Sequence, residues 1–384
     1  MPALPDTSST TVAAIYAAIV RAESEPPRAH LGASVLGRDC RRALWYAFRW
    51  CAEETTDGRV LRLFRRGRLE EDQFVRDLRA AGVTVHDRDE RGQQYRFSDV
   101  GGHAGGSMDA AIVGLVEAPK TFHVAEFKTH GAKSFAALAK DGVQKSKPEH
   151  WCQMQLYMHW TGMERAFYLA VNKDTDELHG ERIHYDKAAA EALVAKARAI
   201  ITAPEPLERI SEKPEFFACK FCDARAVCHE QRISRPSCRT CVHATPELDG
   251  DARWSCALHS RDLSISEQRA GCADHVYIPA LVPLDFVEGN EAGNYAEYRR
   301  HDGSTLRNGS GDKGVYTSAE LHAAQDDLTV LDDATLAWLR INMGGRLESV
   351  RAEPPKEFDD FEQIKAALPL ASERASIPES EIPY

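Results

Sequence analysis

One short strand constrains the fold and the chemistry of this chain more than any other feature. Residues 121–128 read Thr-Phe-His-Val-Ala-Glu-Phe-Lys, and their apolar and β-branched start predicts a buried strand. Side chains two apart on a strand point to the same face, so Glu126 and Lys128 share one face while Phe127 lies on the other. Packing gives no reason for two charges in a buried strand, which indicates a chemical role. A surface hairpin with an ordinary Glu–Lys ion pair is the alternative.

A second strand is predicted just upstream, over residues 105–113, followed by a turn at residues 117–120. A hairpin of this kind places Asp109 beside Glu126. Two carboxylates and one lysine on the same face form a site for a hard divalent cation, next to an amine that handles a proton or stabilises charge.

A long helix is predicted over residues 60–78, with Leu63, Phe64, Phe74, Val75 and Leu78 facing inward. Glu71 falls on nearly the same face, and an inward carboxylate is costly unless it binds a cation or a base. The alternative is a surface glutamate, because Glu70 and Asp72 are adjacent acids.

Downstream, a helix over residues 148–160 starts with a proline at a permitted position and places Gln153 and Tyr157 on one face. A strand is predicted over residues 165–172, with a returning partner at 181–185. The remaining predictions are helices at 11–23, 34–50, 134–140 and 187–201, a strand at 83–86 and a polar loop at 141–148.

The ten cysteines fall into two sets and two single residues. In the first set a Cys-x2-Cys pair and a third cysteine indicate one metal ion or cluster, with an upstream cysteine as the candidate fourth ligand: Cys219, Cys222, Cys228 and Cys40. The second set also starts with Cys-x2-Cys and predicts a four-thiolate site more typical of zinc: Cys238, Cys241, Cys256 and Cys272. One of these four thiol ligands could be replaced by a nearby histidine, either His243, His259 or His275. The alternative for the whole set is that its cysteines bind no metal and are structural. Cys51 and Cys152 are assigned to packing.

The formal net charge of −11 argues against bulk adsorption to nucleic acid, but the charges are unevenly distributed. The C-terminal third is acidic, as in residues 357–362, whereas basic residues gather in the N-terminal half: Arg38, Arg41, Arg42, Arg49, Arg59, Arg62, Arg65, Arg66, Arg68, Lys133, Lys140, Lys145 and Lys147. No apolar run is long enough to span a bilayer, and the first ten residues do not resemble a secretory signal. We therefore expect a cytoplasmic protein with no membrane partner.

The ordered set Cys40, Glu71, Asp109, Glu126-x-Lys128, Gln153-x3-Tyr157 and Cys219-x2-Cys222-x5-Cys228 resembles the PD-(D/E)XK nuclease superfamily. It looks most like the RecB-like branch with an iron–sulfur cluster, which includes the AddB nuclease domain, CRISPR-associated nucleases and phage recombination exonucleases. The resemblance covers about residues 31–228. It departs from the pattern at Met108, where the superfamily has proline, and at Glu70-Glu71, where the branch often has histidine.

The resemblance implies an α/β fold with a restriction-endonuclease-like core, in which helices flank a mixed central sheet. It also implies roles for each residue. Asp109 and Glu126 would hold Mg²⁺ or Mn²⁺ with Glu71 completing the shell, and Lys128 would position the attacking water or stabilise the transition state. Gln153 would orient Lys128 or the phosphate, Tyr157 would contact the DNA backbone, and a 4Fe-4S cluster would join Cys40 to Cys219, Cys222 and Cys228.

These inferences predict four segments: an N-terminal helix (1–30), a nuclease core with its cysteine clamp (31–230), a four-cysteine module (236–280), and an α+β extension with an acidic tail (281–384). The expected function is a metal-dependent DNA exonuclease of phage or bacterial recombination, acting on ends or single strands, with a single-strand annealing or recombination protein as partner. The alternative is a catalytically idle DNA-binding scaffold whose cysteine module recruits such a partner. A metal-dependent transcription factor would leave the Glu126/Lys128 strand unexplained.

Overall fold

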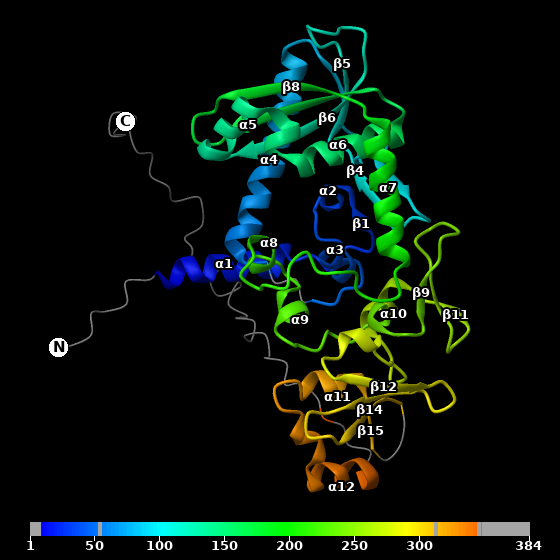
Figure 1. The fold of residues 1–384 in the computed structure, drawn as a ribbon. Helices are drawn as coiled ribbons and strands as arrows, with labels where there is room; N and C mark the ends of the chain where they lie inside the picture. The colour runs from blue at the N-terminus through cyan, green and yellow to red at the C-terminus, as the bar shows by residue number, and fades with distance from the viewer. Residues whose placement is uncertain (1–8, 53–55, 311–313, 344–346, 348–384) are drawn as a thin grey trace, which may run out of the picture. The chain divides into compact units, whose positions relative to one another are not determined.

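A five-stranded mixed sheet contains the strand that carries Glu126 and Lys128. In the computed structural model, which describes residues 9–52, 56–310, 314–343 and 347, this sheet has the order β2-β5-β6-β7-β8 (Figure 1). Its strands are β2 (Thr84–His86), β5 (Ala110–Val113), β6 (His123–His130), β7 (Arg165–Asn172) and β8 (Leu178–His184). β6 pairs antiparallel with β5 and parallel with β7, so it lies in the middle of the sheet and starts two residues later than predicted. The predicted α/β class with a mixed central sheet is confirmed.

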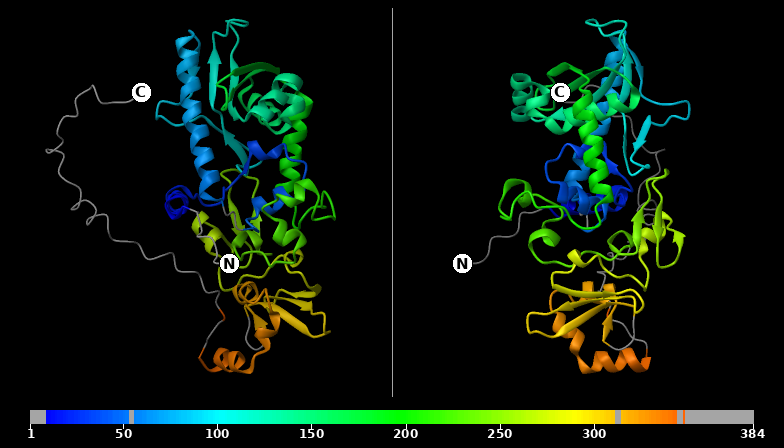
Figure 2. Two further views of the ribbon diagram at one scale, coloured as in Figure 1. Left: turned by 90° about the vertical axis from the view of Figure 1, so that its left-hand side faces the viewer. Right: turned by 45° about the vertical axis from the view of Figure 1, so that its right-hand side comes forward.

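Helices cover both faces of this sheet, as the left view of Figure 2 shows. On one face lies α4 (Gly58–Ala80), whose Phe74 stacks on Phe127 with ring centroids 5.3 Å apart. On the other face lie α5 (Ala132–Ser146) and α6 (Pro148–Thr161), with α7 (Lys187–Thr202) packed against α6. The strand alternation that places Phe127 toward α4 therefore turns Glu126 and Lys128 toward α5 and α6.

The single helix predicted over residues 34–50 is wrong, because the chain forms α2 (Ala33–Leu36) and α3 (Arg41–Phe48) instead. Gly37 lies at the break and packs directly on α6: a Cβ there would be 2.8 Å from the Glu149 Cα atom. Cys40 is consequently the N-cap of α3, where its sulfur accepts a hydrogen bond from the Ala43 amide at 3.4 Å.

The polar loop predicted over residues 141–148 is also wrong, because α5 extends to Ser146. The helix changes direction at Gly142, where φ is +72°, a value that favours glycine. The Glu181 carboxylate accepts the freed amide of Val143 at 2.9 Å, and the Val143 side chain is fully buried. A buried side chain and a satisfied amide explain why this lysine-bearing stretch stays helical.

The strand predicted over residues 105–113 divides into two strands of different sheets. β4 (Ala104–Ser107) lies between β1 (Leu31–Gly32) and β3 (Arg96–Asp99), whereas β5 joins the central sheet. Asp109 lies between β4 and β5, immediately before β5 begins.

The N-terminal helix α1 (Thr10–Glu23) packs across the start of α4, where Gly58 lies so close that a Cβ would be 2.3 Å from the Tyr16 carbonyl oxygen. Just beyond that crossing, residues 62–66 of α4 are largely uncovered, whereas the later part of the helix packs on the central sheet. Leu63 and Phe64 are 49% and 53% exposed, so the prediction that they face inward is wrong.

Apart from Cys40, both cysteine sets lie on or beside short elements beyond α7. These are α8 (Phe217–Lys220), α9 (Arg225–His229), η1 (Cys238–Thr240), β9 (Ala244–Pro246), β10 (Trp254–Cys256), β11 (Arg261–Asp262), α10 (Ile265–Ala270) and η2 (Pro279–Leu281). One hydrophobic cluster includes side chains of α3, β10 and β13, so the cysteine-rich part shares its core with the preceding elements.

The C-terminal part forms a sheet of the order β12-β13-β14-β15. Its strands are β12 (Asp285–Asn290), β13 (Tyr295–Arg299), β14 (Thr305–Gly309) and β15 (Val315–Tyr316), and β13 pairs antiparallel with β14. The elements that follow are α11 (Ser318–Ala323), η3 (Leu328–Asp332) and α12 (Ala334–Met343). The acidic tail after Pro354 lies outside the described residues, as does the segment before Ser9. Within the described ranges, every helix is too short or too polar to cross a bilayer.

Candidate active site

Asp109 and Glu126 meet as the predicted hairpin required. Ala110 pairs with Ala125, so the next position outward brings Asp109 opposite Glu126. The Asp109 carboxylate accepts the Phe127 amide at 2.8 Å, which fixes it on the edge of β6. Glu126 is fully buried. Two carboxylates therefore lie at opposite positions of neighbouring strands, with Glu126 fully buried and Asp109 partly buried.

Lys128 extends along β6 toward Glu126, and its ammonium donates to the Glu126 carboxylate and, at 3.1 Å, to the Phe127 carbonyl. That ion pair uses Oε1 of Glu126. The other oxygen, Oε2, is buried and has no hydrogen-bond partner among the described residues. A buried carboxylate oxygen without a partner is costly, which is the expected condition of a ligand oxygen that lacks its cation.

Glu71 joins this group from α4, and its electrostatic neighbours are Asp109 and Lys128. Burial raises the pKa of Glu71 to about 7, and the Asp109 charge adds to the shift. Burial raises the pKa of Glu126 to about 8 against the opposing effect of Lys128, and burial also raises the pKa of Asp109. Burial alone would lower the pKa of Lys128, but the charges of Glu126 and Asp109 outweigh it and raise that pKa. Three carboxylates around one ammonium leave an excess of buried negative charge that a divalent cation would neutralise.

Gln153 and Tyr157 lie on one face of α6 as predicted, but both are buried, at 6% and 2% exposure. The Tyr157 hydroxyl donates to the Ser107 carbonyl at 2.7 Å and also bonds the Gln153 side chain. The ring passes over Gly106, where a Cβ would be 2.6 Å from the hydroxyl oxygen. Tyr157 therefore holds the segment leading to Asp109, and this geometry does not fit the expected contact with a DNA backbone.

Three residues that the sequence analysis did not select lie beside Lys128. The Tyr168 hydroxyl is 2.8 Å from His130 Nε2 and 2.8 Å from His150 Nδ1, so it donates to one ring and accepts from the other. Burial lowers the pKa of His130 to about 4 and that of His150 to about 3, and nearby Lys128 and Lys147 act in the same direction. His130 was detectable, because it continues the alternation of Glu126 and Lys128 along β6. Tyr168 could not be detected from the sequence, because its place at the site depends on the parallel register of β6 and β7, which pairs it with Glu126.

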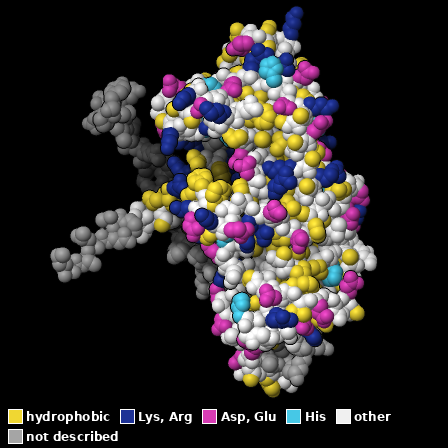
Figure 3. Space-filling model, in the orientation of Figure 1, with side chains coloured by type: hydrophobic (Ala, Val, Ile, Leu, Met, Phe, Trp, Pro, Cys, Tyr) yellow, Lys and Arg dark blue, Asp and Glu magenta, His cyan; other side chains and the backbone are white. Residues whose placement is uncertain are grey.

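Basic side chains accompany this site along α4. Arg62 and Arg66 are exposed, and neither forms an ion pair with the described residues, whereas Arg65 pairs with Glu23 at 3.0 Å. On α5, Lys145 pairs with Asp141 at 2.7 Å, and Lys147, between α5 and α6, donates to the Ser134 carbonyl at 3.1 Å. Figure 3 shows a recess bordered by lysine, arginine and hydrophobic side chains on the side where Figure 1 places α4.

No protein-family model and no curated protein matches the chain. Solved structures are similar over part of it. The crystal structure of SSO0001 aligns with 54% of this chain and 90% of its own, at 15% identity and a TM-score of 0.34. An alkaline exonuclease from Laribacter hongkongensis, LHK-Exo, aligns with 45% of this chain and 87% of its own, at 19% identity and a TM-score of 0.34. Its complex with dAMP aligns with 49% of this chain, at 17% identity and a TM-score of 0.32.

The first cysteine set converges although its members are far apart in sequence. Cys40, Cys219, Cys222 and Cys228 line one pocket together with Tyr46, Arg209 and Arg225. Burial raises the pKa values of Cys219 and Cys222, and the neighbouring Cys40 and Cys228 add to both shifts. Arg209 donates to the Cys228 carbonyl at 2.6 Å. Four sulfurs around one pocket, with arginines beside them, fit an anionic metal–thiolate centre.

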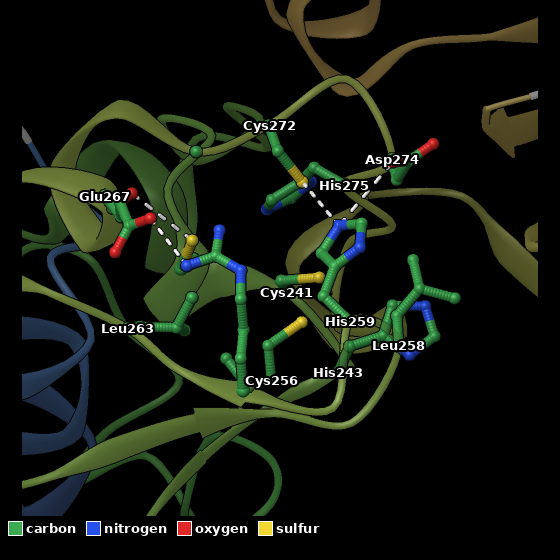
Figure 4. A pocket seen from close by; sticks show the side chains of 14 residues that line it. Cys241, His243, Cys256, Leu258, His259, Leu263, Glu267, Cys272, Asp274 and His275 are labelled. Carbon is green, nitrogen blue, oxygen red and sulfur yellow. Dashed lines mark hydrogen bonds and ion pairs between the residues drawn. The ribbon is translucent and has the colours of Figure 1, made fainter.

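The second set converges in another pocket, shown in Figure 4. Its wall includes Cys238, Cys241, Cys256 and Cys272, and His259 Nε2 lies 3.9 Å from the Cys272 sulfur and 3.6 Å from the Asp274 carboxylate. His243 and His275 also line this pocket, but His275 Nδ1 lies 2.6 Å from the Ser318 hydroxyl and His243 Nε2 lies 2.7 Å from the Asn294 amide oxygen. Of the three candidate histidines, His259 is the one with a ring nitrogen recorded near a thiol of this set, that of Cys272. Cys51 is buried in the core and Cys152 is partly buried, as packing residues would be.

Proposed function

We propose that this chain is a divalent-metal-dependent nuclease that hydrolyses phosphodiester bonds of DNA. The observation that carries the proposal is the group of Asp109, Glu126 and Lys128 at neighbouring positions of β6 and the start of β5, with Glu71 of α4 in electrostatic reach of Asp109 and Lys128. This combination suits phosphoryl chemistry, because it pairs oxygen ligands for a hard cation with a fixed positive charge for the phosphate.

The donor set fits Mg²⁺ or Mn²⁺ better than a softer metal, since all three side chains offer carboxylate oxygens. Asp109 and Glu126 would hold the ion, with the unpaired Oε2 of Glu126 as one ligand and Glu71 as a third. When bound, the ion would lower the pKa of a water molecule and neutralise charge on the scissile phosphate.

The chain's own groups position the reactants around that centre. Lys128 is held by Glu126 and the Phe127 carbonyl, so its ammonium is fixed where negative charge on a phosphate oxygen would develop. Tyr157 fixes the backbone before Asp109. His130 and His150 stay neutral beside Lys128 and add no competing positive charge to the site.

We infer that the enzyme is an exonuclease that acts on DNA at an end or on a single strand. Arg62 and Arg66 on the exposed face of α4 supply local positive charge to a chain whose net charge is −11. Phe64, on the same uncovered stretch, offers a ring on which an unpaired base would stack. The 4Fe-4S cluster is assigned to Cys40, Cys219, Cys222 and Cys228, with a structural role.

The proposal is tested with end-labelled DNA in the presence of Mg²⁺ or Mn²⁺. We expect the wild type to release nucleotides, and Glu126→Gln and Glu71→Gln to reduce the rate by about 10²–10³-fold, because each removes a charge from the metal site. Glu70→Gln is the matched control, since Glu70 is adjacent to Glu71 in sequence, and it should retain nearly the wild-type rate.

Equal degradation by the wild type and Glu126→Gln would place the activity elsewhere or in a contaminant. DNA binding without cleavage by the wild type, in either metal, would favour the scaffold alternative. Covalently closed DNA separates the two modes of attack, because an exonuclease leaves it intact.

A further inference from the structure

The nuclease proposal leaves the second cysteine set without a role, and the structure gives it one. Cys238 and Cys241 lie at the two ends of the tight turn η1, Cys256 ends β10 and Cys272 follows α10. In Figure 4 the sulfurs of Cys241, Cys256 and Cys272 point into the same space. The four cysteines come from separate short elements and all line one pocket. This arrangement is usual for a structural zinc site.

Arg239, between the first two cysteines, points the other way and is buried in an aromatic cage. Its guanidinium lies 3.7 Å from the Trp50 ring centroid and 4.7 Å from that of Trp254, and its side chain is 1% exposed. It donates to the Phe48 carbonyl at 2.8 Å and to the Ala29 carbonyl at 2.9 Å. The turn that carries two thiols is thus bonded to the end of α3 and to the segment before β1.

Arg49 forms the second half of this contact. It is 4% exposed, it stacks on Trp45 and Trp254, and it donates to the Arg239 carbonyl at 3.1 Å. Neither arginine has a carboxylate within ion-pair distance in the described part of the chain, although both are buried. Two buried cations without a counter-charge are costly.

A zinc ion with four thiolate ligands is a net anion, and Arg49 already lies within electrostatic reach of Cys241. We propose that Cys238, Cys241, Cys256 and Cys272 bind one zinc ion, and that this anionic site, with Arg239 and Arg49, fixes the module to α3 as a structural part of the core. This inference is independent of the nuclease proposal. It assigns the module a role inside the fold in place of the partner recruitment considered from the sequence.

His259 completes the assignment without being a ligand. Its Nε2 lies between the Cys272 sulfur and the Asp274 carboxylate, a position suited to donating a hydrogen bond to a metal-bound thiolate. His259, Cys272 and Asp274 offer three donor atoms within 4.8 Å of one another, so a site built on these three is the alternative that the test must separate.

Metal analysis of the full-length protein tests the ligand set. We expect about one zinc per chain in the wild type. Cys256→Ser and Cys272→Ser should lose it, while Cys228→Ser from the first set and Cys152→Ser from α6 should keep it. His259→Ala should also keep it. Zinc retained by Cys256→Ser, or lost by His259→Ala, would overturn the four-cysteine assignment.

Hydrogen exchange tests the structural role and does not depend on a variant that folds. Zinc is removed from the wild type with a chelator, and amide exchange is compared across peptides. We expect amides of α3 to exchange about tenfold faster or more in the zinc-free protein, while those of β6 and β7 change less. Restored zinc should restore protection. Unchanged exchange in α3 would show that the module is a separable finger, and the proposal would then be wrong.

Discussion

At the scale of single residues, the site is defined by an imbalance of charge. Three carboxylates and one ammonium meet where Glu126 has no exposure to water, and one of its oxygens is left without a partner. Such an arrangement opposes folding unless protons or a cation neutralise it. The raised pKa values of Glu71 and Glu126 are the protein's response when no cation is bound.

The stability of the metal-free protein should therefore fall as the pH rises from about 4.5 to about 8. Glu126 has an ordinary pKa of 4.5 and a folded-state pKa of about 8, so in this range the folded protein keeps a proton that the unfolded chain has lost. The stabilising contribution of the Glu126 proton is complete below the ordinary pKa of 4.5, and it is lost as the pH rises past the folded-state pKa of about 8. Mg²⁺ competes with that proton, so it should stabilise the protein more at about pH 8 than at about pH 6.

Thermal unfolding over this pH range, with and without Mg²⁺, measures both effects. Glu126→Gln serves as the control, because it removes the titrating group while keeping the size of the side chain. Its stability should depend less on pH and respond less to Mg²⁺. Identical pH profiles for the two proteins would show that this carboxyl does not titrate in the range.

Much of this site could be predicted from the sequence, because it follows from strand alternation and one hairpin. Those rules place Glu126 and Lys128 on one face and Asp109 beside them, as the structure has them. The role of Tyr157 could not be predicted, because its partner, Ser107, lies 50 residues away in another sheet. Contacts that depend on how separate elements pack leave no local pattern in the chain.

At the scale of elements, two of the wrong predictions concern glycines. Gly37 was placed inside a helix, but the chain breaks there so that α2 can lie directly against α6. Gly142 was placed in a loop, but it is a bend within α5. The residues around Gly37 and Gly142 give no local sign that sets these two glycines apart from Gly67, which lies inside the regular helix α4. The difference lies in the neighbouring backbone.

The same substitution at two of these glycines should consequently have opposite effects. At Gly37 a new methyl group would be 2.8 Å from the Glu149 Cα atom and 3.0 Å from the Cys152 Cβ atom, so Gly37→Ala should destabilise the protein by about 1–3 kcal/mol. At Gly67 a Cβ meets nothing within 4 Å, and Gly67→Ala should stabilise it by about 0.5–1 kcal/mol. Urea unfolding of both variants checks the pair, and a stabilising Gly37→Ala would mean that α2 and α6 are not in contact.

At the scale of the whole molecule, one pocket brings a cysteine from the beginning of the core together with cysteines from its end. Cys40 precedes α3, and its partners in the pocket, Cys219 and Cys222, follow α7 in sequence. α3 also receives the Arg239 and Arg49 contacts of the second cysteine set. One short helix is thus held from both sides by segments about 200 residues away in the chain, roughly the span that one domain covers.

Loss of the first cysteine set should therefore destabilise the molecule as a whole and not only locally. If a cluster bound by Cys40 and Cys219 acts as a crosslink around so long a loop, the chain-entropy model gives an upper value of about 5 kcal/mol. We expect the Cys40→Ser protein to lose its iron and to unfold at a much lower urea concentration. The control is Cys152→Ser, because the Cys152 thiol is partly buried and lies outside both sets. This control should keep the iron and change the free energy of unfolding by less than about 1 kcal/mol. Iron content after anaerobic purification and urea midpoints measure the two effects separately. A Cys40→Ser protein that retains iron would remove Cys40 from the ligand set. One that loses iron but keeps its urea midpoint would show that packing around α3, and not the cluster, holds the two ends of the core together.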